Sequence, residues 1–195
     1  MSPGAAAATD LDNAKRILLA ELRDHALTIG EVTLSSGAVA QYYVDARRAL
    51  LRPAGFRAAG ELIAAAALEA GATAVGGPAT AAIPLACAAI AVPAGAGLVG
   101  FFVRGERKAH GLQRWVEGPV ERGDRVLVVE DTVTSGGSTV AAIERLREEG
   151  LEVAAVLAAV DRLAGGGPAI EAVAAAPYRA LVTIDELYPE RPDRG

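Results

Sequence analysis

The stretch Val126–Val140 reads VLVVEDTVTSGGSTV, and it decides the fold class. Four apolar residues predict a buried strand, two acids follow, and a Gly-rich turn leads into the helical pattern of residues 138–149. A strand that is apolar throughout and is followed at once by a helix is typical of a parallel sheet covered on both faces. Because ligands of such sheets bind at the carboxyl ends of strands, the turn is a candidate binding site.

Strands and helices alternate on both sides of this stretch, which predicts an α/β fold with a central, mostly parallel sheet flanked by helices. We expect one domain over residues 1–195, with a disordered tail at 1–9 and an N-terminal segment at 10–50. The expected helices are residues 10–27, 54–70, 80–92, 138–149 and 168–176, and the expected extended segments are residues 31–36, 41–48, 72–77, 98–104, 125–131, 152–160 and 178–184.

Composition excludes several classes of protein. A chain of 195 residues with 52% hydrophobic and 22% charged residues is expected to fold. The net charge of -5 argues against a nucleic-acid partner. The single Cys87 suits a reducing compartment, and the apolar run Ala79–Val92 is too short to span a membrane. We therefore expect a cytoplasmic protein without a nucleic-acid or membrane partner.

Two familiar glycine signatures do not apply. The pattern GAGLVG at residues 95–100 precedes a strand, whereas a dinucleotide-binding turn follows a strand and opens a helix. The turn TSGGST at residues 134–139 lacks the lysine of a Walker A loop. A different anion-binding role is needed for the turn.

The chemistry of the turn favours a sugar phosphate. Its glycines let backbone N–H groups approach an anion, and the following helix adds its positive dipole end. Glu130 and Asp131 would repel a polyphosphate but accept hydrogen bonds from sugar hydroxyls. The alternative is an ordinary connection whose Ser and Thr side chains cap the helix.

A second candidate is the charged stretch at residues 104–114, which we predict to be a mobile loop. Gly105 and Gly111 loosen its backbone, and positive charge gathers there in an acidic chain. It could close over an anionic ligand, or it could be a solvated hairpin tip. Its basic residues are Arg104, Arg107, Lys108, His110 and Arg114.

Three stretches together resemble the orotate phosphoribosyltransferases, which are type I phosphoribosyltransferases. VLVVEDTVTSGGST resembles the family's motif for phosphoribosyl pyrophosphate (PRPP), and FFVRGERKAHGLQRWVEG, Phe101–Gly118, resembles its catalytic loop. GEVTLSSGAVAQYYVDARR, Gly30–Arg48, resembles its N-terminal substrate segment. The resemblance covers about Gly30 to Arg162 and implies the type I phosphoribosyltransferase fold, with a small N-terminal substrate-binding subregion and a mobile catalytic loop.

The resemblance also implies an activity. The family transfers a phosphoribosyl group from PRPP to orotate, releasing pyrophosphate and forming orotidine 5'-monophosphate in pyrimidine biosynthesis. Mg2+ is expected as the cofactor, bound mainly through PRPP, and no metal ligand is assigned to the protein. A homodimer is implied, with the catalytic loop shared across the interface.

Residue roles follow by matching positions. Lys108, Arg104 and His110 match catalytic loop residues that contact pyrophosphate. Tyr43, Thr134 and Arg162 match the orotate site, where the arginine would grip the carboxylate. The residues implied in PRPP binding are Arg104, Lys108, His110, Glu130, Asp131, Thr132, Val133, Thr134, Ser135, Gly136, Gly137 and Ser138.

The chain departs from the family pattern at several positions. Gly105 and Ser35 stand where many members carry lysines, and the stretch GGPATAAIP, residues 76–84, carries alanines where many have Gly or Asp. Three other functions stay open: a phosphoribosyltransferase for another nucleobase, a non-catalytic regulator with the PRPP fold that binds RNA, and an interaction protein whose site has decayed.

Overall fold

A six-stranded sheet forms the centre of the protein. The computed structural model describes residues 3–33, 39–106 and 114–194. The strand order is β5-β4-β3-β6-β7-β8, and all neighbours are parallel except the β4–β5 pair at one edge. The strands are β3 (Ala74–Pro78), β4 (Val99–Val103), β5 (Val116–Glu117), β6 (Arg125–Val133), β7 (Glu152–Asp161) and β8 (Tyr178–Thr183).

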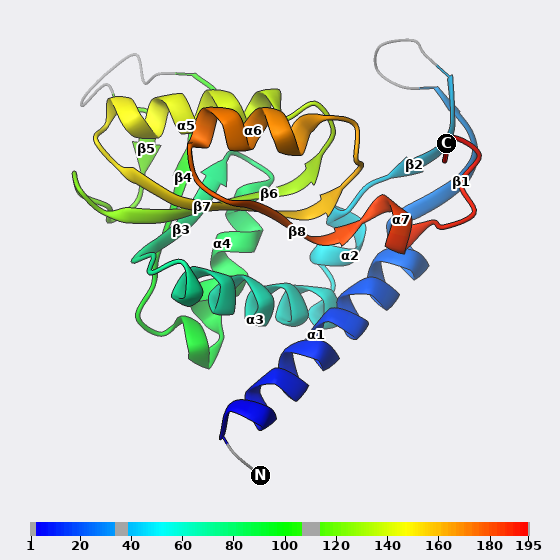
Figure 1. Cartoon of the computed structure of the whole chain (residues 1–195), viewed down its shortest axis with the longest axis horizontal. Coiled ribbons are helices and arrows are strands. Elements are labelled where there is room, and N and C mark those ends of the chain that lie inside the picture. The colour runs from blue at the N-terminus through cyan, green and yellow to red at the C-terminus, as the bar shows by residue number, and fades with distance from the viewer. Residues whose placement is uncertain (1–2, 34–38, 107–113, 195) are drawn as a thin grey trace.

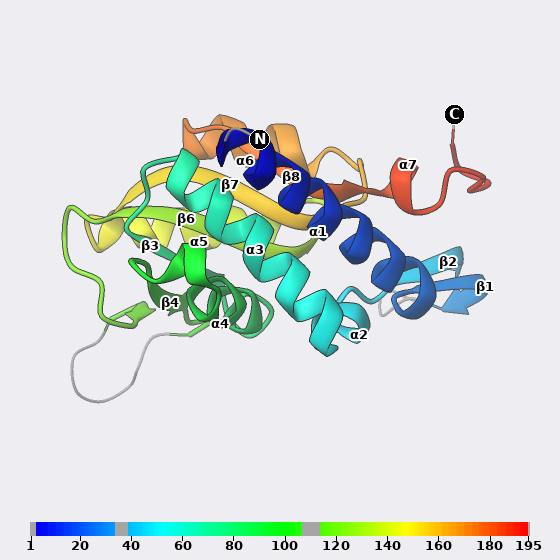
Figure 2. The ribbon, with the colours of Figure 1, turned by 90° about the horizontal axis from the view of Figure 1, so that it is seen from below.

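Helices cover both faces of this sheet, as Figures 1 and 2 show. Helices α5 and α6 lie on one face, and α3 and α4 lie on the other, with α1 packed outside α3. The middle of β6, Val126–Val129, is apolar and buried because both faces of the sheet are covered. The helices are α1 (Pro3–His25), α2 (Arg47–Leu50), α3 (Pro53–Glu69), α4 (Ala82–Ala91), α5 (Gly137–Glu148), α6 (Gly166–Ala174) and α7 (Ile184–Leu187), and a 3-10 turn spans Pro93–Gly95.

A separate antiparallel hairpin, β1 (Leu27–Thr33) and β2 (Val39–Val44), stands at one end of the main sheet. The C-terminal end of the described chain lies beside this hairpin (Figure 1). Within the described ranges, no helix combines the length and the apolar character that crossing a membrane requires.

The strand order reverses between β3 and β6. The chain moves from β3 outward to β4, then returns to add β6 on the other side of β3. The connections after these two strands therefore diverge and leave a crevice at their carboxyl ends. The Gly-rich turn after β6 lies there, as the sequence pattern predicted.

The element boundaries differ from the sequence expectation in several places. Residues 3–9, expected in a disordered tail, belong to α1, because a run of alanines has high helix propensity. This helix ends at His25, so Leu27 is a strand residue. Residues 47–48, expected as extended, start the short helix α2.

A short helix near the C-terminus was missed. The expected strand at residues 178–184 ends at Thr183, which starts α7 with a capping box. The Thr183 hydroxyl accepts a hydrogen bond from the Glu186 amide, while the Glu186 carboxylate accepts one from the Thr183 amide. The spacing Thr-x-x-Glu was visible in the sequence and could have indicated this helix start.

Candidate functional site

The Gly-rich turn joins β6 to α5 and forms a small pocket. Gly136 is the N-cap residue of α5, with φ at +79°, and it makes no side-chain cap. The pocket, which we call the loop pocket, has a volume of about 220 Å³. Because the N-cap residue is a glycine, no Ser or Thr side chain caps α5, which was the alternative interpretation of the turn. The backbone N–H groups of the first helical turn are therefore available to an anion. The lining residues are Thr132, Val133, Thr134, Ser135, Gly136, Gly137, Ser138 and Thr139.

Glu130 is buried at the end of β6, with only 4% of its surface exposed. Its Oε2 accepts hydrogen bonds from the Ser138 hydroxyl at 2.9 Å and the Thr139 hydroxyl at 3.1 Å. Burial raises the pKa of the Glu130 carboxyl, and the two hydroxyl contacts oppose the rise. The carboxylate thus ties the end of β6 to the first turn of α5, where the helix dipole favours negative charge.

Asp131 has a different environment from its neighbour. Burial raises the pKa of its carboxyl, and a hydrogen bond from the Thr132 amide and the charge of Arg47 oppose that rise. The Arg47 Nε lies 4.0 Å from the Asp131 Oδ2 and 2.8 Å from the Asp45 Oδ1. Asp131 therefore faces a second pocket that is rich in charge.

This second pocket, which we call the hairpin pocket, lies between the β1–β2 hairpin and the carboxyl ends of β6 and β7. Its volume is about 330 Å³, and it shares Thr132 and Thr134 with the loop pocket. The two pockets are thus neighbours, as expected for two parts of one ligand-binding site. The lining residues are Tyr43, Val44, Asp45, Ala46, Arg47, Ala81, Asp131, Thr132, Thr134 and Arg162.

The three residues predicted for the orotate site, Tyr43, Thr134 and Arg162, all line the hairpin pocket. The Arg162 Nε is buried and has no hydrogen-bond partner in the part of the chain that the structure describes. Its guanidinium carbon lies 5.4 Å from the ring centroid of Tyr42. A buried guanidinium nitrogen without a partner suits a pocket that binds an anionic group.

Hydrogen bonds to Asp161 fix the backbone of the loop that carries Arg162. Asp161 is buried, and its carboxylate accepts hydrogen bonds from the Leu163 amide at 2.7 Å and the Tyr178 hydroxyl at 2.9 Å. Burial, together with the Asp161 charge, raises the pKa of the Tyr178 hydroxyl. Asp161 thus fixes the backbone at the end of β7, and the Arg162 side chain that follows it lines the hairpin pocket.

The charged loop is only partly described. Arg104 lies outside both pockets, and its Nη1 is 3.5 Å from the Glu117 Oε1. Lys108 and His110 lie outside the described residues, as do Arg107 and Ser35. The structure therefore brings the predicted residues of the Gly-rich turn close to those of the orotate site, but Arg104 does not lie with them.

Sequence reasoning missed Asp45, Arg47 and Ala81 as lining residues of the hairpin pocket. Asp45 and Arg47 occur in the segment QYYVDARR, where their charges could have been noticed. Ala81 precedes α4 and carries no chemical signal. Only the crevice between β3 and β6 brings it to the site.

Known proteins are similar to this chain over most of its length. The model of the phosphoribosyl transferase domain family matches residues 47–174. An orotate phosphoribosyltransferase of Streptomyces avermitilis is 45% identical over 179 residues, which cover 91% of this chain and 98% of that protein.

Solved structures lead to the same group. A Mycobacterium tuberculosis H37Rv orotate phosphoribosyltransferase in complex with Fe(III) dicitrate has a TM-score of 0.82 and 39% identity, covering 90% of this chain and 99% of that one. A structure of that enzyme in complex with PRPP has a TM-score of 0.77 and 34% identity, covering 89% and 98%. The predicted fold class is confirmed.

Proposed function

The chain belongs to the orotate phosphoribosyltransferase family, and we propose that its loop pocket and hairpin pocket bind PRPP and orotate side by side. The chain transfers the phosphoribosyl group of PRPP to orotate and releases pyrophosphate. The observation that carries the assignment is the buried Nε of Arg162, which no described residue pairs with, in a pocket that shares Thr132 and Thr134 with the loop pocket.

PRPP binds through the residues at the end of β6. Its 5'-phosphate occupies the loop pocket, where the amides of Ser135 to Ser138 and the start of α5 supply donors and a positive dipole end. The Asp131 carboxylate accepts hydrogen bonds from the ribose hydroxyls, since it faces the hairpin pocket. Glu130, which lines neither pocket, holds the Gly-rich turn in place through Ser138 and Thr139.

Orotate binds in the hairpin pocket. The guanidinium of Arg162 pairs with the orotate carboxylate in a bidentate contact, which uracil cannot make. Tyr43 is 36% exposed and lines the pocket, so its ring can pack on the pyrimidine. Thr134 lies between the two pockets and contacts both substrates.

The reaction passes through a ribose with oxocarbenium character, by analogy with other glycosyl transfers. Negative charge grows on the departing pyrophosphate, and Lys108, Arg104 and His110 stabilise that charge. Closure of the 104–114 loop keeps water from the ribose.

Mg2+ is proposed as the cofactor. The described residues contain no group of three or more His, Cys, Asp or Glu side chains placed to hold a metal ion. We expect the ion to be held mainly by the oxygens of PRPP, because phosphate oxygens are hard ligands of the kind that Mg2+ prefers. When bound, Mg2+ neutralises charge on the pyrophosphate group.

We also propose a cytoplasmic homodimer in which each catalytic loop serves the partner's site. In support, Arg104, at the start of the loop, lies outside both pockets of its own chain. Sedimentation velocity tests the dimer, and a monomer at micromolar concentration with full activity would contradict it.

The function is tested by following orotate absorbance with PRPP and Mg2+. Loss of absorbance is expected only when both are present. A parallel panel with uracil, adenine and hypoxanthine tests the alternative of another nucleobase, and turnover of uracil in preference to orotate would overturn the role of Arg162.

A further inference from the structure

The hairpin pocket lies between two sheets that are separate in the described part of the chain. Tyr43 comes from the β1–β2 hairpin, whereas Asp131 and Arg162 come from the ends of strands in the main sheet. Since these are separate sheets, side-chain contacts between them help to determine the width of the pocket.

Tyr42 makes such contacts. It is buried, with 4% of its surface exposed, and its side chain lies on the opposite face of β2 from that of Tyr43. Its ring faces the Arg162 guanidinium at 5.4 Å and meets the Tyr188 ring edge-on at 5.6 Å. Its hydroxyl donates a hydrogen bond to the Asp193 Oδ2 at 3.1 Å.

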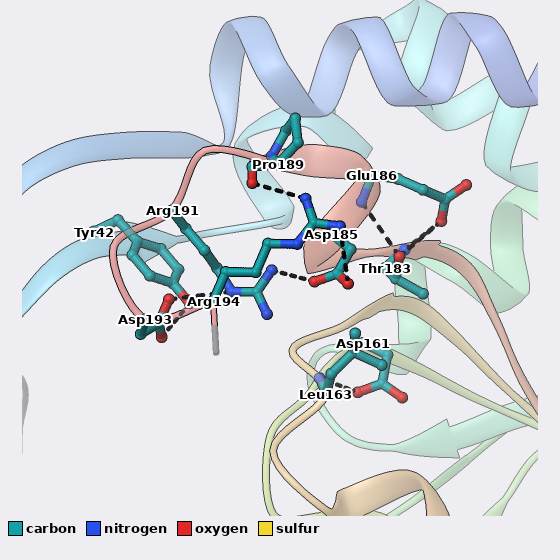
Figure 3. A network of polar contacts seen from close by, with 10 residues as sticks. All are labelled: Tyr42, Asp161, Leu163, Thr183, Asp185, Glu186, Pro189, Arg191, Asp193 and Arg194. Atoms are coloured by element: carbon teal, nitrogen blue, oxygen red, sulfur yellow. Dashed lines mark hydrogen bonds and ion pairs between the residues drawn. The ribbon is translucent and has the colours of Figure 1, made fainter.

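Two of these contacts belong to residues 188–194, which we call the C-terminal brace. Figure 3 shows how the brace folds back beside Tyr42. The Arg191 side chain, 11% exposed, pairs with Asp193 at 3.1 Å and with Asp185 of α7. Because α7 follows β8 directly, the brace connects the main sheet to the hairpin through Tyr42.

We propose that Tyr42, held by Asp193 of the C-terminal brace, is a positioning residue that orients Arg162 for the nucleobase substrate. Among the described residues the Arg162 Nε has no hydrogen-bond partner, and the Tyr42 ring lies against that guanidinium. Losing the hydroxyl contact lets the ring and the hairpin shift, which misplaces Arg162 without touching the loop pocket. This inference rests on the proposed function, because it requires that the hairpin pocket binds orotate.

The test compares Tyr42→Phe and Asp193→Ala with Glu190→Ala, a control that removes an exposed carboxylate from the same brace. For the first two variants, we expect KM for orotate to rise about threefold to tenfold, as loss of a single hydrogen bond implies. KM for PRPP and kcat stay within about twofold, and the control matches the wild type. The double variant is expected to resemble Asp193→Ala, because both changes remove the same contact.

The inference is overturned if KM for orotate is unchanged in both variants, or if KM for PRPP and kcat change as much as KM for orotate. Tyr42→Phe keeps the ring and decides the question even if Asp193→Ala fails to fold. A failure of the proposed function is seen separately, because the wild-type protein would then consume no orotate.

Discussion

Two adjacent glycines in the Gly-rich turn are expected to respond in opposite ways to the same substitution. Gly136 has φ at +79°, and a Cβ there would lie 2.9 Å from the Ile170 Cγ1 and 3.0 Å from the Gly166 carbonyl oxygen. The left-handed conformation costs an Ala about 1–2 kcal/mol, and overpacking against the buried Ile170 costs about 1–3 kcal/mol more. Gly136→Ala should therefore lower the free energy of unfolding by roughly 2–5 kcal/mol.

Gly137 lies one residue later, but a Cβ there would meet only the Ser135 Oγ, at 4.0 Å. Its methyl group points into the space of the loop pocket, so Gly137→Ala should leave stability unchanged or raise it by up to about 1 kcal/mol. It should weaken PRPP binding at least tenfold, or about 1.4 kcal/mol, because the methyl group occupies the position of the phosphate.

Urea denaturation followed by circular dichroism measures the first quantity, and calorimetric titration with PRPP measures the second. Each variant is the control for the other, since both add one methyl group to the same turn. Wild-type affinity of Gly137→Ala for PRPP would refute the placement of the phosphate. Wild-type stability of Gly136→Ala would refute the argument from strain and packing.

Three further changes test other parts of the site. Arg162→Ala should raise KM for orotate at least tenfold with little change in KM for PRPP in steady-state assays, because it removes the carboxylate contact; equal effects on both constants would speak against that contact. Burial raises the folded-state pKa of Glu130, so the wild type should lose stability relative to Glu130→Gln as pH rises from about 4.5 through that raised pKa. If the free energies of unfolding of the two proteins, measured with urea, change with pH in the same way, this reasoning is wrong. Lys108→Ala should lose most of its turnover while its circular dichroism spectrum stays unchanged, and a near-normal kcat would argue against its catalytic role.

Much of the site could be predicted because it is local in the sequence. The run from Glu130 to Ser138 contains its strand end, acids and glycine turn within nine residues, so propensity and pattern suffice to place it. The two acids, however, looked equivalent in the sequence. Folding buries Glu130 against two hydroxyls of α5 and turns Asp131 toward Arg47, because successive strand residues face opposite sides.

The sequence by itself determined the α/β class, the Gly-rich turn and the family, because each is indicated by short stretches whose patterns are local in the chain. Only the tertiary structure decided that Asp45, Arg47 and Ala81 line the same pocket as the residues that the family resemblance had assigned to one site. Ala81 lies there because the strand order reverses at β3 and β6. Contacts between residues far apart in the chain depend on how strands order and pack, and no local pattern of side chains encodes that order.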